Sequence, residues 1–278
     1  MSVSVTPDSL SVEVPGGRLA AGRWAGSGPT VVLLHAGVVD RRAWTATADR
    51  LAGAYDVVAY DRRGFGDSPL TPKPFTHLED LRAVLDAAAV EKAWLVGSSA
   101  GGRVTVDFAL TYPERVAGLV LVGPAISGEP DIEADAETER LEALVAAAID
   151  ADDLDEANRL EAWLWLDGPA GPEGRVGGPV RELFLVMNAI ALRSEAESAA
   201  GTGNSELDAW SRLAEITVPV TVAWCELDID VLNDRCRNLV ERLPSGSGRE
   251  LRHVAHLPYL ENPDLFADLI RDVVATDA

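Results

Sequence analysis

The sequence has few of the features that mark a secreted or a membrane protein. Its 278 residues include only two cysteines, Cys225 and Cys236, which are too few for a disulfide framework. No run of 18 or more apolar residues occurs, so no membrane-spanning helix is predicted. The first residues lack a basic segment followed by an apolar one, so no signal peptide is expected. We therefore expect a cytoplasmic protein.

Positive charge is also scarce. Lysine and arginine number 24 against 45 aspartates and glutamates, which gives a net charge of −21. Such a surface repels nucleic acid and anionic membranes, so neither is expected as a partner. No metal-ligand cluster, phosphate-binding loop or dinucleotide fingerprint occurs, so no metal and no cofactor are expected. The expected partner is a small-molecule substrate, and a homodimer is allowed.

Short β-branched and aliphatic runs alternate with helical patterns through residue 123. These runs are Thr30–Leu34, Tyr55–Tyr60, Ala93–Val96 and Val116–Val122. Continuous apolar runs are typical of strands that are buried on both faces. The alternation predicts an α/β fold with a mostly parallel, doubly wound sheet. In such a fold, functional residues lie beyond the carboxyl ends of the strands.

The chain changes character between residues 127 and 215, where the buried β runs disappear. Helical patterns cover Thr138–Ala148, Asp155–Leu166 and Val180–Leu192. A buried run returns at Val218–Trp224, which favours an insertion over an independent helical domain. We predict an α/β core of residues 1–126 and 216–278, with residues 127–215 as a helical cap. The remaining patterns predict a turn at Pro244–Gly248, a last strand at Arg249–Val254 and a closing helix at Leu265–Val274.

The segment Gly97-x-Ser99-x-Gly101 follows one buried run and precedes a helical pattern. This spacing is typical of a nucleophile elbow, in which a serine sits on a sharp turn between a strand and a helix. Small neighbours are needed there because backbone segments approach closely. A serine hydroxyl also needs a base within hydrogen-bond reach. The sequence predicts Ser99 as a nucleophile.

Histidine is the natural base at neutral pH, and the chain contains four. His256 follows the last predicted strand, on the same sheet edge as Ser99, and is predicted as the base. His35, in the loop after the first buried run, is the alternative, although its backbone is better placed to shape the pocket. His253 is placed inside the last strand as a structural residue. His77 is placed at the solvated start of a surface helix.

A catalytic triad also needs an acid that orients the histidine. Asp228 follows the returning strand and can reach His256 from the adjacent strand end. Glu226 and Asp230 are alternatives in the same loop, as solvated acids or helix caps. The other strand end that could supply the acid, after Val122, carries no carboxylate. The order serine, aspartate, histidine is the one found in α/β-hydrolases.

The oxyanion formed in acyl transfer needs two N–H donors. We predict Ala100, at the helix start, and Gly37 or its neighbour Val38 as these donors. Aromatic residues of the cap and core that could line an apolar acyl pocket, although such residues are more often core, are Trp44, Trp163, Trp165, Phe184 and Trp210. Of these, Trp44, Trp163 and Phe184 are predicted with Val38 as pocket residues.

Several segments resemble the α/β-hydrolase superfamily. His35-Ala36-Gly37 is similar to its His-Gly oxyanion loop, and Asp61-x-Arg63-Gly64-x-Gly66-x-Ser68 to the turn after its next strand. Cys225-x-x-Asp228 resembles its acid loop, and Ala255-His256-Leu257-Pro258 its histidine loop. The resemblance spans nearly the whole chain. Within the superfamily it is closest to capped esterases and lactonases such as β-ketoadipate enol-lactone hydrolase.

The resemblance implies a serine hydrolase that cleaves a small to medium carboxylic ester or lactone through an acyl-enzyme. A non-hydrolytic enzyme of the same fold, either a perhydrolase or a hydroxynitrile lyase, is one alternative. A ligand receptor built on the same scaffold is another. Fold alone does not decide between them, because one fold hosts many functions.

Overall fold

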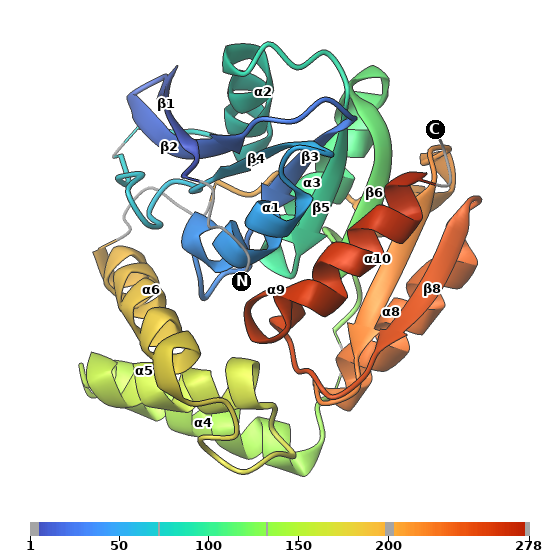
Figure 1. The fold of residues 1–278 in the computed structure, drawn as a ribbon. Helices are drawn as coiled ribbons and strands as arrows, with labels where there is room; N and C mark the ends of the chain where they lie inside the picture. Colours follow the sequence, from blue (N-terminus) through green and yellow to red (C-terminus); the bar gives the residue numbers. More distant parts are fainter. Residues whose placement is uncertain (1–5, 72, 132, 198–202, 276–278) are drawn as a thin grey trace.

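An eight-stranded sheet forms the centre of the protein (Figure 1). The structure is a computed structural model and describes residues 6–71, 73–131, 133–197 and 203–275. The strand order is β1-β2-β4-β3-β5-β6-β7-β8, with β1–β2 and β2–β4 antiparallel and every later pair parallel. The strands are β1 (Asp8–Val14), β2 (Gly17–Trp24), β3 (Thr30–Leu34), β4 (Asp56–Tyr60), β5 (Ala93–Ser98), β6 (Val116–Val122), β7 (Val220–Cys225) and β8 (Gly246–Leu251). The predicted mostly parallel sheet is confirmed.

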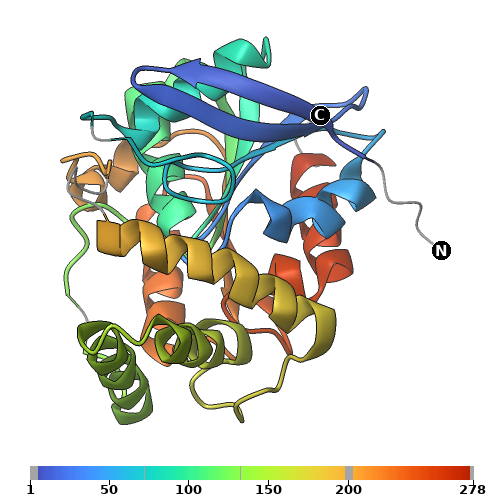
Figure 2. The same ribbon diagram turned by 90° about the vertical axis from the view of Figure 1, so that its left-hand side faces the viewer.

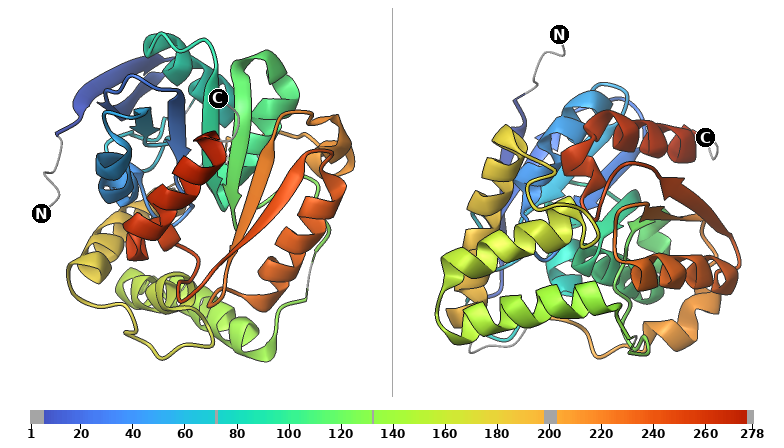
Figure 3. Two further views of the ribbon diagram at one scale, coloured as in Figure 1. Left: turned by 45° about the vertical axis from the view of Figure 1, so that its right-hand side comes forward. Right: turned by 90° about the horizontal axis from the view of Figure 1, so that it is seen from below.

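The central strands bury side chains on both faces of the sheet. In β3, Val31 and Leu33 belong to one hydrophobic cluster, whereas Val32 and Leu34 belong to the other. The first cluster is covered by α1 (Thr45–Leu51), α9 (Pro258–Glu261) and α10 (Pro263–Ala275). The second is covered by α2 (His77–Ala87), α3 (Ala100–Thr111) and α8 (Asp230–Arg242). Figures 1 and 3 show these two helical layers on either side of the strands.

Among the residues that the structure describes, the segment between β6 and β7 consists of helices joined by loops and contains no strand. Its elements are α4 (Ala136–Asp150), α5 (Leu154–Glu161), the π-helical turn η3 (Ala162–Asp167), α6 (Gly178–Glu197), α7 (Ala209–Arg212) and η4 (Leu213–Glu215). We call residues 127–215 the insertion. Its helices α4, α5 and α6 lie beyond one end of the sheet (Figures 1 and 2). None of the described helices, α6 with its 20 residues included, is long and apolar enough to cross a membrane.

The two segments that connect the insertion to the sheet both form hydrogen bonds with α3. The Ser127 hydroxyl donates to Asp107 Oδ2 at 2.7 Å, and the Ser205 hydroxyl donates to the same oxygen. The Trp210 N–H donates to the Ser127 carbonyl at 2.9 Å. Asp107 is buried, and this burial raises the pKa of its carboxyl group. The helix that begins at the serine elbow therefore also holds both ends of the insertion.

The predicted turn at Pro244–Gly248 is right for Pro244 and Ser245 and wrong from Gly246 onward, because β8 begins at Gly246 and ends at Leu251. Gly246 and Gly248 pair with β7 in the parallel ladder. A Cβ on Gly248 would lie 2.9 Å from the Trp224 ring, so the close packing of β8 requires glycine there. Glycine in a strand commonly marks such a close approach, but in the sequence it has the same appearance as a turn.

Two histidines lie in surroundings that the sequence did not predict. His253 is in a turn after β8, at φ 63°, with a side chain 89% exposed, and so is neither in the strand nor buried. His77 does begin α2, but it is only 4% exposed. Its ring contacts the Phe75 ring with centroids 5.3 Å apart, and its backbone N–H donates to the Gly203 carbonyl. The insertion's return segment covers the start of this helix, and only the tertiary structure reveals that contact.

Candidate active site

Ser99 occupies a strained turn between β5 and α3. Its backbone has φ 51° and ψ −118°, a region that L-residues rarely adopt. Its N–H donates to the Val122 carbonyl at 3.0 Å, and its carbonyl accepts from the Ala125 N–H at 3.1 Å. The residue is half-buried. The neighbouring strand end at β6 thus holds the turn on both sides.

Close packing explains the glycine that follows in the elbow. A Cβ on Gly101 would lie 2.4 Å from the Leu34 carbonyl oxygen and 2.6 Å from that of His35. The first turn of α3 therefore lies directly against the end of β3. This contact brings the loop after β3 beside Ser99.

His256 and Asp228 form a buried pair. The His256 Nδ1 lies 2.7 Å from Asp228 Oδ2, and the two side chains are 2% and 1% exposed. The other carboxylate oxygen, Oδ1, accepts the Ile229 N–H at 2.9 Å. His256 Nε2 is buried and has no hydrogen-bond partner among the described residues. Buried polar atoms are normally satisfied, so this nitrogen has the capacity to accept one more hydrogen bond.

Gly123 connects this pair to Ser99. It follows Val122, whose carbonyl binds the Ser99 N–H, and it has φ 44°. A Cβ on Gly123 would lie 3.0 Å from His256 Cε1 and 3.3 Å from Asp228 Oδ2. The imidazole therefore packs directly over the backbone next to Ser99. The sequence shows that no carboxylate follows Val122. It does not show that the next position, Gly123, must lack a side chain altogether.

Gly123→Ala is expected to lower kcat by about 100-fold, because displacing a catalytic group by about 1 Å costs that much. The added methyl group would press on the imidazole and displace it from its position against Asp228. Steady-state kinetics measure the effect. Gly53→Ala is the matched control, since Gly53 has φ 83° but nothing within 4 Å of its Cβ position. Equal losses of kcat in the two variants would show that backbone strain, and not the collision with His256, causes the effect.

Gly37 and Ala100 lie side by side. A Cβ on Gly37 would be 3.9 Å from the Ala100 Cβ. The Ala100 N–H is at the start of α3, where helices leave N–H groups without intrahelical partners. Within the described residues, no hydrogen bond from either N–H to a protein acceptor is found. Both residues, and Val38, are half-buried, so the predicted oxyanion donors are accessible.

Arg62 supports the loop that carries Gly37. Its Nη2 donates to the carbonyls of His35 and Ala36 at 3.3 and 3.2 Å. In a trans peptide the carbonyl and the next N–H point in opposite directions. Because the Ala36 carbonyl faces Arg62, the Gly37 N–H faces away from it.

His35, the alternative base, has both ring nitrogens occupied. Its Nδ1 is 2.7 Å from the Ala36 carbonyl oxygen, and its Nε2 accepts the Arg62 backbone N–H at 3.1 Å. Burial and the Arg62 charge lower the pKa of His35 well below its usual value. The residue is therefore a neutral, structural part of the loop.

The alternative acids do not contact His256 in the structure. Glu226 is exposed, and its Oε2 accepts the His253 N–H at 2.8 Å. Asp230 is exposed at the start of α8. Cys225, three residues before Asp228, is fully buried, and burial raises the pKa of its thiol well above the usual value. These groups surround the buried pair without joining it.

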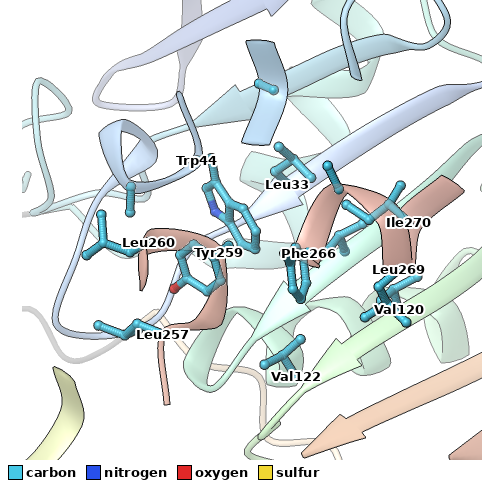
Figure 4. Packing of buried hydrophobic residues seen from close by; sticks show 14 of the residues in the cluster. Leu33, Trp44, Val120, Val122, Leu257, Tyr259, Leu260, Phe266, Leu269 and Ile270 are labelled. Carbon is cyan, nitrogen blue, oxygen red and sulfur yellow. The ribbon is translucent and has the colours of Figure 1, made fainter. Parts of the chain in front are cut away.

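The predicted pocket aromatics are dispersed. Trp44 is wrong as a pocket residue, because it is 0% exposed and stacks on Tyr259 in the core, with ring centroids 3.6 Å apart (Figure 4). Phe184 is also fully buried in that core cluster. Trp163 lies under Arg140 and donates to the Gly171 carbonyl. Helical periodicity could not separate these residues, because a core face and a pocket face look alike in sequence.

Trp165 is the aromatic residue of the insertion that contacts the buried pair. Its ring lies 4.8 Å from the His256 ring, centroid to centroid, with an interplanar angle of 47°. It is half-buried and belongs to the π-helical turn η3. Trp210, by contrast, packs under Arg242. The insertion therefore reaches the site through Trp165.

Comparisons with known proteins cover the whole site. The sequence profile of the alpha/beta hydrolase family matches residues 31–269. Pimeloyl-[acyl-carrier protein] methyl ester esterase of Aeromonas hydrophila is 28% identical over 90% of this chain and 96% of its own. A 2-hydroxy-6-oxononadienedioate/2-hydroxy-6-oxononatrienedioate hydrolase of Comamonas testosteroni is 26% identical over 90% of this chain and 89% of its own. A thermophilic esterase from Thermogutta terrifontis has the same fold, with a TM-score of 0.78 at 23% identity over 97% of this chain and 99% of that one.

Proposed function

The chain belongs to the alpha/beta hydrolase family, and from that premise we propose that it is a serine hydrolase of small to medium carboxylic esters or lactones. The observation that carries the proposal is the buried His256–Asp228 pair, whose imidazole Nε2 has no hydrogen-bond partner among the described residues and whose ring packs over Gly123 beside Ser99. The name of the Aeromonas relative, a methyl ester esterase, favours an ester as the substrate. The finer resemblance to enol-lactone hydrolases stays a prediction.

Acylation begins when His256 Nε2 takes the proton of the Ser99 hydroxyl as the oxygen attacks the ester carbonyl. The Gly37 and Ala100 N–H groups hold the resulting oxyanion. Asp228 keeps the imidazole in the tautomer that leaves Nε2 free to accept, and it stabilises the imidazolium. His256 then gives its proton to the leaving oxygen as the carbon–oxygen bond breaks, which releases the alcohol and leaves the acyl-enzyme.

Deacylation repeats these steps with water in place of the serine. His256 takes a proton from water, the hydroxide oxygen attacks the acyl carbonyl, and the same two N–H groups hold the oxyanion. The proton returns to Ser99 as the acid is released. In this scheme residues 1–126 and 216–278 form the catalytic core, and residues 127–215 act as a cap over it.

Covalent labelling by a fluorophosphonate, together with turnover of short-chain p-nitrophenyl esters, tests the proposal. The expected result is one phosphonylated residue, Ser99, identified by peptide mass spectrometry, in protein that also hydrolyses the esters. Labelling at another residue would contradict the assigned nucleophile. An unlabelled protein without ester turnover would contradict the function itself.

A further inference from the structure

The π-helical turn η3 places an aromatic side chain directly beside the proposed base. The ring centroids of Trp165 and His256 lie 4.8 Å apart, and Trp165 is half-buried. Turns of this kind are rare in proteins. Where they do occur, they often lie at functional sites. The contact joins the insertion to the residue that handles the proton.

The end of this turn is held by Asp167, which is 0% exposed. Its carboxylate accepts the N–H groups of Gly174 and Val176 at 2.8 and 2.9 Å and pairs with Arg181 at 2.7 Å. A buried carboxylate with three partners fixes the loop that follows η3. These contacts hold the end of the turn that carries Trp165.

A second set of contacts connects η3 to the histidine loop. Arg175 donates to the Leu166 carbonyl at 2.8 Å and pairs with Glu261 at 2.7 Å. Glu261 in turn accepts the N–H of Ala255 at 2.7 Å. Ala255 immediately precedes His256 in the chain. A chain of hydrogen bonds through Arg175 and Glu261 therefore links the residue after Trp165 to the residue before His256.

The direction of the reaction decides which part of an ester would meet Trp165. The leaving oxygen must lie within hydrogen-bond reach of His256 Nε2, because that nitrogen returns the proton. The carbonyl oxygen must lie on the other side, at Gly37 and Ala100. A side chain packed on the imidazole is thus beside the alcohol part of the ester and not beside the acyl part.

We propose that Trp165 is a specificity-determining residue that forms the wall of the alcohol site and selects esters of apolar, preferably aromatic, alcohols. The inference rests on the proposed function, and it gives a role to a tryptophan that the sequence did not single out as a pocket residue. Offset or edge-to-face contact with the indole favours an aromatic alcohol over methanol.

Esters of one acid with methyl, ethyl, benzyl and phenylethyl alcohols separate the alcohol from the acyl part. Trp165→Ala is expected to lower kcat/KM for the benzyl and phenylethyl esters about tenfold more than for the methyl ester, the effect of losing one large apolar contact. Comparing variant with wild type cancels the intrinsic reactivity of each ester. Trp165→Phe should retain most of the preference.

The deacylation rate separates a role in specificity from a structural role, because it would change if Trp165 only supported His256. All four esters form the same acyl-enzyme, so its hydrolysis, measured in single-turnover experiments, is expected to be unchanged in Trp165→Ala. Equal losses of kcat/KM for all four esters, or deacylation slowed by the same factor, would overturn the proposal and leave Trp165 as a support for His256. If Trp165→Ala does not fold, an unchanged alcohol preference in Trp165→Leu, which removes the aromatic ring, overturns it as well.

Trp163→Ala is the matched control. Trp163 belongs to the same π-helical turn but bonds to Gly171 and lies under Arg140. Its loss should leave the alcohol preference intact. The fluorophosphonate has no alcohol leaving group, so its reaction with Ser99 does not depend on the alcohol site. Failure of the labelling would contradict the hydrolase function. Labelling of a protein that shows no alcohol preference would contradict only the role of Trp165.

Discussion

Replacing Ser99 with alanine is expected to lower kcat for a p-nitrophenyl ester by about 10⁴-fold or more, the loss seen when a triad serine is removed. The substitution removes the oxygen that attacks the carbonyl and keeps the Cβ. Alanine and serine are equally strained at φ 51°, because both carry a Cβ. The free energy of unfolding should therefore change by only about 0.5 kcal/mol or less.

Steady-state kinetics and fluorophosphonate labelling measure the outcome, and thermal unfolding verifies the fold. Ser98→Ala is the control, because the preceding serine is 0% exposed inside β5 and out of reach of the probe. This variant should still be labelled. Wild-type turnover in Ser99→Ala, or loss of labelling in Ser98→Ala, would remove Ser99 from the mechanism.

The parallel core could be predicted because its strands are continuous apolar runs. Thr30–Leu34 and Val116–Val122 are buried on both faces, so their composition alone marks them as central strands. Chain direction then brings their carboxyl ends to one edge. The sequence thus predicted that Ser99, Asp228 and His256 share that edge, and the structure places Asp228 against His256 there.

The contacts between elements could not be predicted in this way. Gly123 matters because the space of a side chain is filled by the His256 ring, and nothing in a local pattern shows what fills that space. Trp165 falls within a segment, Asp155–Leu166, whose periodicity predicts one continuous helix. The structure ends α5 at Glu161 and continues it as a π-helical turn. Both features arise from packing between segments that are distant in sequence, where propensity gives no guidance.

Asp228→Asn is expected to lower kcat by about 10⁴-fold, as when the acid of a comparable triad is replaced by its amide. The Ile229 N–H, now bound to Asp228 Oδ1, would keep the amide oxygen, which turns the amide NH₂ toward His256 Nδ1. A donor in that place requires the imidazole to accept at Nδ1 and to carry its proton on Nε2. Nε2 could then no longer take the proton of Ser99.

The measurement is kcat for the same ester, together with the rate of fluorophosphonate labelling, which depends on the same proton transfer. Asp230→Asn is the matched control, because this acid lies two residues away, is exposed and has no contact with His256 in the structure. It should retain wild-type activity. A loss of less than tenfold in Asp228→Asn, or the same loss in both variants, would mean that the buried pair does not set the tautomer of the base. Residues other than Asp228 would then have to orient the His256 ring.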